Sequence, residues 1–402
     1  MGCRSLSRFF SSPLTLSPFF LLPHKYSQVA SDADADSSTR FRWAACQLDT
    51  LERCLDYDEL TTALRSLPRD LNETYSRILT SIPEGRRDKA IRILQFLTYS
   101  DRPLTVQEAV DAIAIPLDTH YRFDPKYRLP CPNEIARFCS SLVSLVTRRP
   151  GEETVMELEL AHFSVKEYLT SENVPKPFRC RLSEPDARSC ITRCCLAYLS
   201  CLRTEKPIDK VRGQFPLAGY SAQYWMDHAK PAETIDGIAV TIVDFFEDHA
   251  VYTIWGRLFN PDRPWDDSPK QNTACPLYFA SYKGLNVTAQ MLVEKGADVN
   301  AQGGDYGNAL QAASVGGHQA VVQMLLEKGA DVNAQGGLYG NALQAASAEG
   351  HQAVVQMLLE KGADVNAQSG DYGNALHAAS VEGHQAVVQM LRRRLLQDEG
   401  RR

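Results

Sequence analysis

Two helical patterns alternate in the last third of the chain. Residues 309–315 place small alanines and one leucine on a short helix, and residues 319–327 repeat valine, methionine and leucine at helical spacing. Glycines at 316–317 end the first pattern, and Gly329 follows the second, where a positive φ is expected. Each unit is therefore predicted to contain a small-residue helix, a heavily buried second helix and an extended loop.

This unit recurs every 33 residues. Its first helix begins at Asn308, Asn341 and Asn374, and a diverged earlier copy covers 275–300. The copies 308–340 and 341–373 differ at four positions only. One such unit cannot bury its apolar face alone, so the copies are expected to stack.

The period and sequence of this unit resemble the ankyrin repeat over about 275–391. Asn308 stands where the family has threonine and can still cap the helix. Gln311 replaces the family's histidine, which returns only at His377, so we expect two repeats to lack the usual histidine bond to the loop. A second histidine position, at 318, 351 and 384, is expected to make structural hydrogen bonds rather than to bind metal or catalyse.

Resemblance to ankyrin arrays implies that loop tips and first helices hold a partner protein on a concave face. The loop tyrosines are either recognition anchors or packing contacts between neighbouring loops, and the sequence leaves both open. The candidate partner-binding residues are Gln302, Asp305, Tyr306, Gln335, Leu338, Tyr339, Gln368, Asp371 and Tyr372.

The middle of the chain has the element order of a winged helix. An amphipathic helix, a turn with a capped helix and a third helix precede two alternating segments that predict a β-hairpin, and another helix follows. In chain order these segments are 86–99, 101–113, one that starts over 133–139, 142–147, 154–163 and 161–169.

Residues 41–54 and 67–79 together resemble the tail of the NACHT ATPase domain of fungal NOD-like (STAND) proteins, in which such a winged helix follows. The same winged helix gives its name to a GPI inositol-deacylase family, and residues 220–229 match the helical stretch after it. No G-x-x-x-x-G-K-[ST] run, which would cradle phosphates, occurs in the 402 residues. We therefore expect the C-terminal part of such a protein without its motor, as a truncated paralogue or an incomplete gene model, and an NTPase domain in another chain is a candidate partner.

His162 resembles the winged-helix histidine that contacts the bound nucleotide in related switch ATPases. The alternative is a histidine at a strand end that bonds to local backbone. Apart from this nucleotide-sensor-like position, the sequence predicts no cofactor-binding or catalytic residue.

The eleven cysteines are odd in number and have no regular spacing. Those between 188 and 202 fall within one apolar helical pattern and have no distant ligand pair, so we expect buried thiols and no metal site. This usage favours a reducing, cytoplasmic location.

Charge argues against several functions. With 43 Lys+Arg and 49 Asp+Glu the net charge is −6, which provides no general attraction to nucleic acid or membrane. Residues 83–175 hold 12 basic and 14 acidic residues, which disfavours the alternative function of a DNA-binding winged-helix regulator. The hydrolase and metalloprotease motifs are missing, so a non-enzymatic adaptor is expected. The repeats, 275–391, carry −6 alone, from four lysines, no arginine and ten acids, which suggests a neutral to basic partner.

Residues 1–31 contain no acid, and the apolar patch at 19–22 is too short to span a membrane. We read this part as a disordered leader, with a transit peptide as the alternative. The fold is expected to be mainly α, with a winged helix, a helical connector and an ankyrin solenoid. The predicted boundaries are 1–40 for the leader and linker, 41–85 for a NACHT-tail remnant, 86–172 for the winged helix, 173–270 for the connector and 271–402 for about four repeats.

Overall fold

The computed structural model of the chain describes residues 37–52, 54–116, 123–149, 154–202, 207–235, 237–266 and 274–399. Helices dominate these ranges and a single small sheet accompanies them, which confirms the predicted mainly α fold. The chain divides into two units, Met1–Thr74 and Tyr75–Arg402. No helix in the described ranges is both long enough and apolar enough to cross a bilayer.

The first unit contains α1 (Ser37–Leu51), α2 (Tyr57–Arg65) and the first turn of α3 (Leu71–Ser81). Asp56 caps α2, because its carboxylate accepts a hydrogen bond from the Glu59 amide at 2.7 Å. Helix α1 begins at Ser37, within the range 1–40 that was predicted as leader and linker. The rest of the leader prediction falls on residues 1–36, outside the described ranges.

The second unit begins with the winged helix. The predicted helices are α4 (Glu84–Tyr99) and α5 (Val106–Ala114), and the hairpin is β2 (Val143–Arg148) with β3 (Val155–Leu160). Thr105 and Glu108 form a capping box at the start of α5. A short strand that the sequence did not reveal, β1 (Leu104–Thr105), pairs antiparallel with β3 and gives the order β1-β3-β2.

The third helix of the winged helix differs from the prediction. Residues Pro132–Phe138 form a 3₁₀ helix, η3, between the shorter 3₁₀ turns η2 (Pro125–Tyr127) and η4 (Ser140–Leu142). The segment is short, starts at a proline and ends at the buried Cys139, whose thiol points to the Ala90 carbonyl of α4 at 3.6 Å. Such short connecting pieces are the usual setting of 3₁₀ helices.

A helical connector follows the winged helix. Helix α6 (Phe163–Leu169) still belongs to the winged helix, and the connector consists of α7 (Lys176–Leu182), α8 (Glu184–Ser200), α9 (Ile208–Gln214), α10 (Leu217–Ala232), α11 (Ile238–Glu247) and α12 (His249–Leu258). Its core is aromatic: Trp225 meets Trp255 with ring centroids 5.9 Å apart, and the Trp255 indole donates to the Ala222 carbonyl at 2.9 Å. Cys194 and Cys195 are buried in α8, and burial raises the pKa of Cys195 to about 12, as expected for core thiols.

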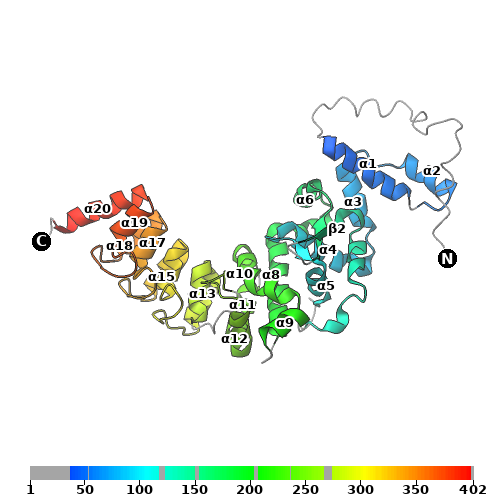
Figure 1. Ribbon diagram of the computed structural model, residues 1–402. Coiled ribbons are helices and arrows are strands. Elements are labelled where there is room, and N and C mark those ends of the chain that lie inside the picture. The colour runs from blue at the N-terminus through cyan, green and yellow to red at the C-terminus, as the bar shows by residue number, and fades with distance from the viewer. Residues whose placement is uncertain are drawn as a thin grey trace. The chain divides into compact units, whose positions relative to one another are not determined.

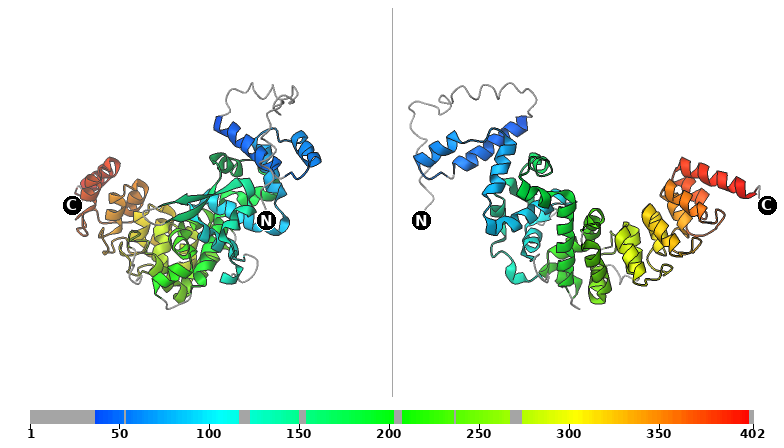
Figure 2. Two further views of the ribbon diagram at one scale, coloured as in Figure 1. Left: turned by 45° about the vertical axis from the view of Figure 1, so that its right-hand side comes forward. Right: turned by 180° about the vertical axis from the view of Figure 1, so that it is seen from behind.

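Four helix pairs then form the ankyrin stack, seen in succession in Figures 1 and 2. The inner helices are small-residue helices that pack one on the next, and the outer helices do the same. Gly329 has φ 89°, as the helix-end prediction required. The pairs are α13 (Pro276–Lys283) with α14 (Asn286–Glu294), α15 (Ala309–Val315) with α16 (Gln319–Glu327), α17 (Ala342–Ala348) with α18 (Gln352–Glu360), and α19 (Ala375–Val381) with α20 (Gln385–Glu399).

Gln311 and Gln344 occupy the position of the missing histidine, and each donates hydrogen bonds to a loop. Gln311 Nε2 donates to the carbonyls of Ala334, Gly336 and Gly340 in the next loop, at 3.4, 3.0 and 3.3 Å. Gln344 makes the corresponding bonds one repeat later. The histidine bond itself is absent from these two repeats, as expected, and the glutamine amides bond the following loop instead, whereas His377 bonds the Tyr372 carbonyl of its own loop.

The second histidine position connects consecutive repeats. The Nε2 atoms of His318, His351 and His384 lie 2.8–2.9 Å from carbonyl oxygens one repeat earlier, those of Tyr282, Val315 and Ala348 respectively. A carbonyl oxygen only accepts, so Nε2 is the donor in each case. The expected structural role of these histidines is confirmed.

A buried polar chain connects α10 to the winged helix. His228 Nδ1 faces the Arg188 guanidinium at 3.3 Å, so it accepts, and Nε2 carries the proton toward the Tyr220 hydroxyl at 2.8 Å. Tyr220 in turn donates to Ser100 Oγ at 2.7 Å. Burial, followed by the Arg188 charge, lowers the pKa of His228 to about 4.

We expect Gln344→Ala to lower the free energy of unfolding by about 1–3 kcal/mol, because it removes the side-chain donor to the part-buried Ala367 carbonyl and one of the two donors to the Gly373 carbonyl. Gln356→Ala is the matched control, since Gln356 is exposed on α18 and bonds only its neighbour Glu360; its effect should stay within about 0.5 kcal/mol. Urea denaturation followed by circular dichroism measures both. Equal losses for the two variants would contradict this role of Gln344.

We expect acid to destabilise the fold through His228. Its pKa is depressed in the folded state, so stability is complete above the unfolded value of about 6.5 and is lost as the pH falls toward 4. The single histidine accounts for a loss of about 3 kcal/mol across that window. His318, whose pKa burial also lowers to about 4, contributes in the same range. Denaturation curves at several pH values should show a smaller slope for His228→Gln than for the unmodified protein.

Candidate protein-interaction surface

The loops between repeats form one continuous ribbon. Each loop closes in a tight hairpin, with bridges Gln302–Asn308, Gly336–Gly340 and Ser369–Gly373. Neighbouring hairpins are joined through their tips: the Leu338 amide donates to the Asp305 carbonyl at 2.9 Å, and the Asp371 amide donates to the Leu338 carbonyl at 3.1 Å. The tips are thus held by backbone hydrogen bonds at a fixed spacing.

Glycine is needed beside these tips. Gly337 has φ 65°, and a Cβ there would lie 2.2 Å from the Tyr306 backbone. Gly370 repeats this arrangement against Tyr339, with φ 63° and 2.3 Å. A side chain at either position would push the hairpins apart.

The loop tyrosines stack on one another. The ring centroids of Tyr282, Tyr306, Tyr339 and Tyr372 follow each other at 5.2, 5.9 and 6.1 Å. We call these four residues the tyrosine ladder. All four are half-buried, so the packing alternative is confirmed, and the partly exposed rings leave the anchor hypothesis as a prediction.

Two carboxylates fix the hydroxyl ends of the ladder. Tyr339 donates to Glu349 and Tyr372 donates to Glu382, each at 2.6 Å. Glu349 and Glu382 end the inner helices α17 and α19 and are exposed. The hydrogen bond to Glu382 is the largest cause that raises the pKa of Tyr372. In the preceding repeat Gly316 occupies this position.

The three tip residues differ in their surroundings. Asp305 forms a bidentate ion pair with Arg263 at 2.6 and 3.1 Å. Leu338 is 50% exposed and Asp371 is exposed. The predicted partner-binding residues therefore lie on one ribbon, but Asp305 already has an intramolecular partner. Gln302, Gln335 and Gln368 are exposed beside the hairpins.

Sequence reasoning missed the junction that anchors the first hairpin. Asp262 is buried, and both of its carboxylate oxygens accept from the Tyr278 hydroxyl, at 3.0 Å each. The Asp305 amide also donates to Asp262, at 2.9 Å, and the Tyr306 amide donates to Tyr278. Tyr278 occupies the repeat position of Gln311, 33 residues earlier. Aligning the diverged first copy at that position could have identified Tyr278, but Asp262 lies outside the repeats and carries no such signal.

The differences between the two most similar repeats fall on this side of the array. Of the four differing pairs, Val315/Ala348 and Gly316/Glu349 end the inner helices, and Gly336/Ser369 and Leu338/Asp371 lie in the hairpins. The outer helices α16 and α18 are identical in sequence. Variation is thus confined to the hairpins and the adjoining ends of the inner helices, which together we call the hairpin face.

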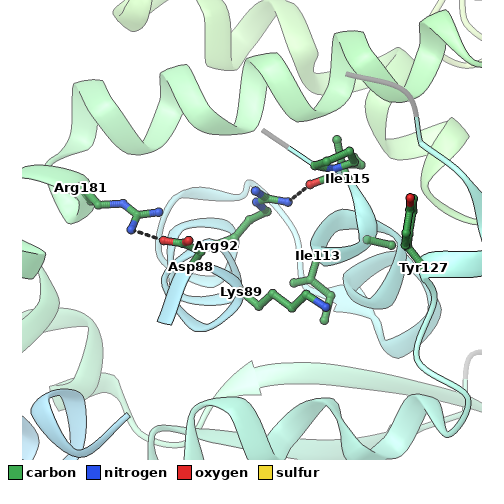
Figure 3. A pocket seen from close by; sticks show the side chains of 9 residues that line it. Asp88, Lys89, Arg92, Ile113, Ile115, Tyr127 and Arg181 are labelled. Atoms are coloured by element: carbon green, nitrogen blue, oxygen red, sulfur yellow. Dashed lines mark hydrogen bonds and ion pairs between the residues drawn. The ribbon is translucent and has the colours of Figure 1, made fainter. Parts of the chain in front are cut away.

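A separate pocket of about 380 Å³ lies among α4, α5 and α7 of the second unit (Figure 3). Two of its three cations have partners: Arg181 pairs with Asp88 at 2.5 Å, and Arg92 donates to the carbonyls of Ala112 and Ile115 at the end of α5. These contacts give the pocket a structural role in holding α4, α5 and α7 together. In the described ranges, no group of three metal-ligating side chains occurs.

His162 caps a helix. Its Nδ1 accepts from the Ser164 amide at 3.3 Å and lies 2.7 Å from Ser164 Oγ, at the start of α6. Ser164 Oγ also meets the Tyr75 hydroxyl at 2.9 Å. The local-backbone alternative is confirmed, and the nucleotide-sensor role stays a prediction.

Two arginines of the winged helix that could contact DNA form ion pairs within the domain. Arg137 of η3 pairs with Glu134 at 2.5 Å, and Arg148 of β2 pairs with Glu157 at 2.6 Å and with Glu159. A seven-residue 3₁₀ helix also replaces the recognition helix that would enter a major groove. These features disfavour DNA binding.

Comparison with known proteins agrees with this architecture. Residues 75–181 match the family model of the GPI inositol-deacylase winged helix domain, and residues 257–336 and 342–392 match models of ankyrin repeats. The chain therefore contains a winged helix of this type followed by ankyrin repeats. It is 39% identical, over 296 residues, to "Azaphilone pigments biosynthesis cluster protein L" of Monascus ruber. The match covers 69% of this chain and 63% of that protein, so the chain spans less than two thirds of its relative.

We expect Tyr278→Phe to cost about 1–3 kcal/mol of stability, because the buried Asp262 carboxylate loses a donor. Arg263→Ala should cost about 1 kcal/mol or less, since its ion pair with Asp305 is exposed to solvent. Chemical denaturation of the two variants tests this ranking. The reverse order would show that the ion pair, rather than the buried carboxylate, anchors the first hairpin.

Proposed function

We propose that this chain is a non-enzymatic, cytoplasmic adaptor whose ankyrin array binds a partner protein through the hairpin face. The observation that carries the proposal is the composition of that face: a backbone-bonded ribbon with an exposed aromatic ladder and tips that differ between otherwise near-identical repeats. Tyrosine supplies large contact area at low entropic cost. A fixed ribbon also reduces the ordering cost of binding.

We further infer that the array is the sensing part of a fungal NOD-like system. The resemblance of 41–54 and 67–79 to a NACHT tail supports this inference, as does the winged helix followed by repeats. Trp255 of the connector packs against Phe279 of the first repeat, with ring centroids 5.2 Å apart. This aromatic contact would transmit a change in the repeats to the connector. An NTPase domain in another chain would receive the signal. The source of the relative, Monascus ruber, is consistent with a fungal protein.

An exchange of tips between repeats tests partner binding. Leu338→Asp with Asp371→Leu swaps residues that the two hairpins already accommodate, so the stability should change by no more than about 0.5 kcal/mol. Binding should weaken by about tenfold or more if the tips contact a partner. Quantitative capture from a lysate of the source organism, with each bound protein measured by mass spectrometry, compares the swap with the unmodified full chain.

The control for this exchange is Lys328→Ala with Lys361→Ala, two exposed residues at the ends of the outer helices. It should leave capture unchanged. If the tip exchange captures the same proteins as strongly as the unmodified chain, the hairpin face is not the binding surface and the proposed function fails.

A further inference from the structure

The lysines of the repeats lie at the connector and on the outer helices rather than on the hairpin face. Residues 275–391 contain four lysines and no arginine. Lys283 and Lys295 pair with Asp227 and Glu247 of the connector. The other two, Lys328 and Lys361, cap the ends of the outer helices. The repeats therefore place no unpaired lysine on the hairpin face.

The hairpin face does carry carboxylates that no lysine of the repeats neutralises. Glu349, Glu382 and Asp371 are all exposed, and the first two stand at the hydroxyl ends of the tyrosine ladder. Each of these glutamates uses Oε1 for the tyrosine hydroxyl, which fixes the carboxylate in place. A carboxylate offers further acceptor sites on its second oxygen. The ladder is thus bordered by preoriented acceptors with negative charge.

The aromatic rings, like the carboxylates, favour a positively charged ligand. The face of an aromatic ring attracts a cation, and arginine also stacks on it through its planar guanidinium group. The successive rings of Tyr306, Tyr339 and Tyr372 lie 5.9 and 6.1 Å apart. Alternate side chains on one side of an extended peptide lie about 6.6 Å apart, which is close to this spacing.

We propose that the ladder and its carboxylates bind an extended, basic segment of a partner protein, with lysine or arginine at alternate positions. The stems of these side chains lie on the tyrosine rings and on Leu338, and their cationic heads reach Glu349, Glu382 and Asp371. This inference rests on the proposed function and specifies the chemistry of the partner. Arginine forms the stronger contacts, because its planar fork matches a carboxylate in two hydrogen bonds.

A peptide titration with the full chain tests the proposal. Fluorescence anisotropy near physiological salt measures three labelled peptides of equal length: alternating arginine and serine, the same residues in two blocks, and alternating glutamate and serine. We expect the alternating basic peptide to bind about tenfold more tightly than the block peptide, and the acidic peptide not to bind. Absent binding of the basic peptide, or equal binding of the block peptide, overturns the proposal.

Two double variants distinguish binding at the ladder from a general effect of the net charge of the protein. Glu349→Gln with Glu382→Gln removes two charges beside the ladder, and the amides can still accept from the tyrosines. Glu327→Gln with Glu360→Gln removes two charges from exposed positions on the outer helices. The first pair should weaken binding about tenfold and the second less than about twofold. Equal weakening by both pairs would show non-specific attraction and reject the site.

The two experiments fail in different ways. If the tip exchange abolishes protein capture but the basic peptide does not bind, the adaptor function stands and the basic-segment inference is wrong. If the tip exchange leaves capture unchanged, the function itself is wrong, whatever the peptide does. Circular dichroism of each variant confirms that it is folded before binding is measured.

Discussion

The array depends on one polar contact per repeat. The fourth residue counted from the N-cap of each inner helix sends a side chain to the loop that would otherwise be loosely held: Tyr278, Gln311 and Gln344 to the following hairpin, and His377 to Tyr372 at 2.7 Å in its own. Small alanines bring the helices together, but they do not fix the loops. The polar contact orients each hairpin, and the oriented hairpins bring the tyrosines into register and join the tips. Tyrosine, glutamine and histidine all occupy this position, because each can form a hydrogen bond with the backbone of a loop, which an aliphatic side chain cannot do.

The first repeat is joined to the connector by the same kinds of contact that join the repeats to one another. Tyr278 uses its position to bond Asp262, and Phe279 beside it packs on Trp255. Buried hydrogen bonds and aromatic packing therefore act at one junction, which makes a hinge there costly. The connector is joined in turn to the winged helix by the Ser100–Tyr220–His228 chain. A partner bound to the repeats is thus connected to the winged helix through a continuous series of direct contacts.

The repeats could be predicted from sequence because their period is imposed by stacking: the last three copies present the same inner-helix alanines and the same asparagine caps. The winged helix was readable from its element order, and the capping box at Thr105 marked α5. Other features had no local signal. Strand β1 has two residues, too few to show alternation. Asp262 became important only through contacts to residues 16 and 43 positions later. Glu349 reads as an ordinary surface acid until the fold brings Tyr339 to it. Long-range pairs of this kind depend on geometry that no short window of sequence contains.

The joined hairpin tips also bear on how such a chain changes its length. Both tip-to-tip hydrogen bonds, and the ladder steps from Tyr306 to Tyr339 and from Tyr339 to Tyr372, connect a residue to its counterpart 33 positions away. Loss or duplication of one whole unit therefore recreates the same contacts at the new boundary, while the attachment at Arg263 and Asp262 remains with the first hairpin. Unequal recombination between the near-identical copies can lengthen or shorten the surface by one whole repeat at a time. Each resulting array keeps the same contacts between repeats. The length of the binding surface is therefore set by the number of repeats, which is an inherited property.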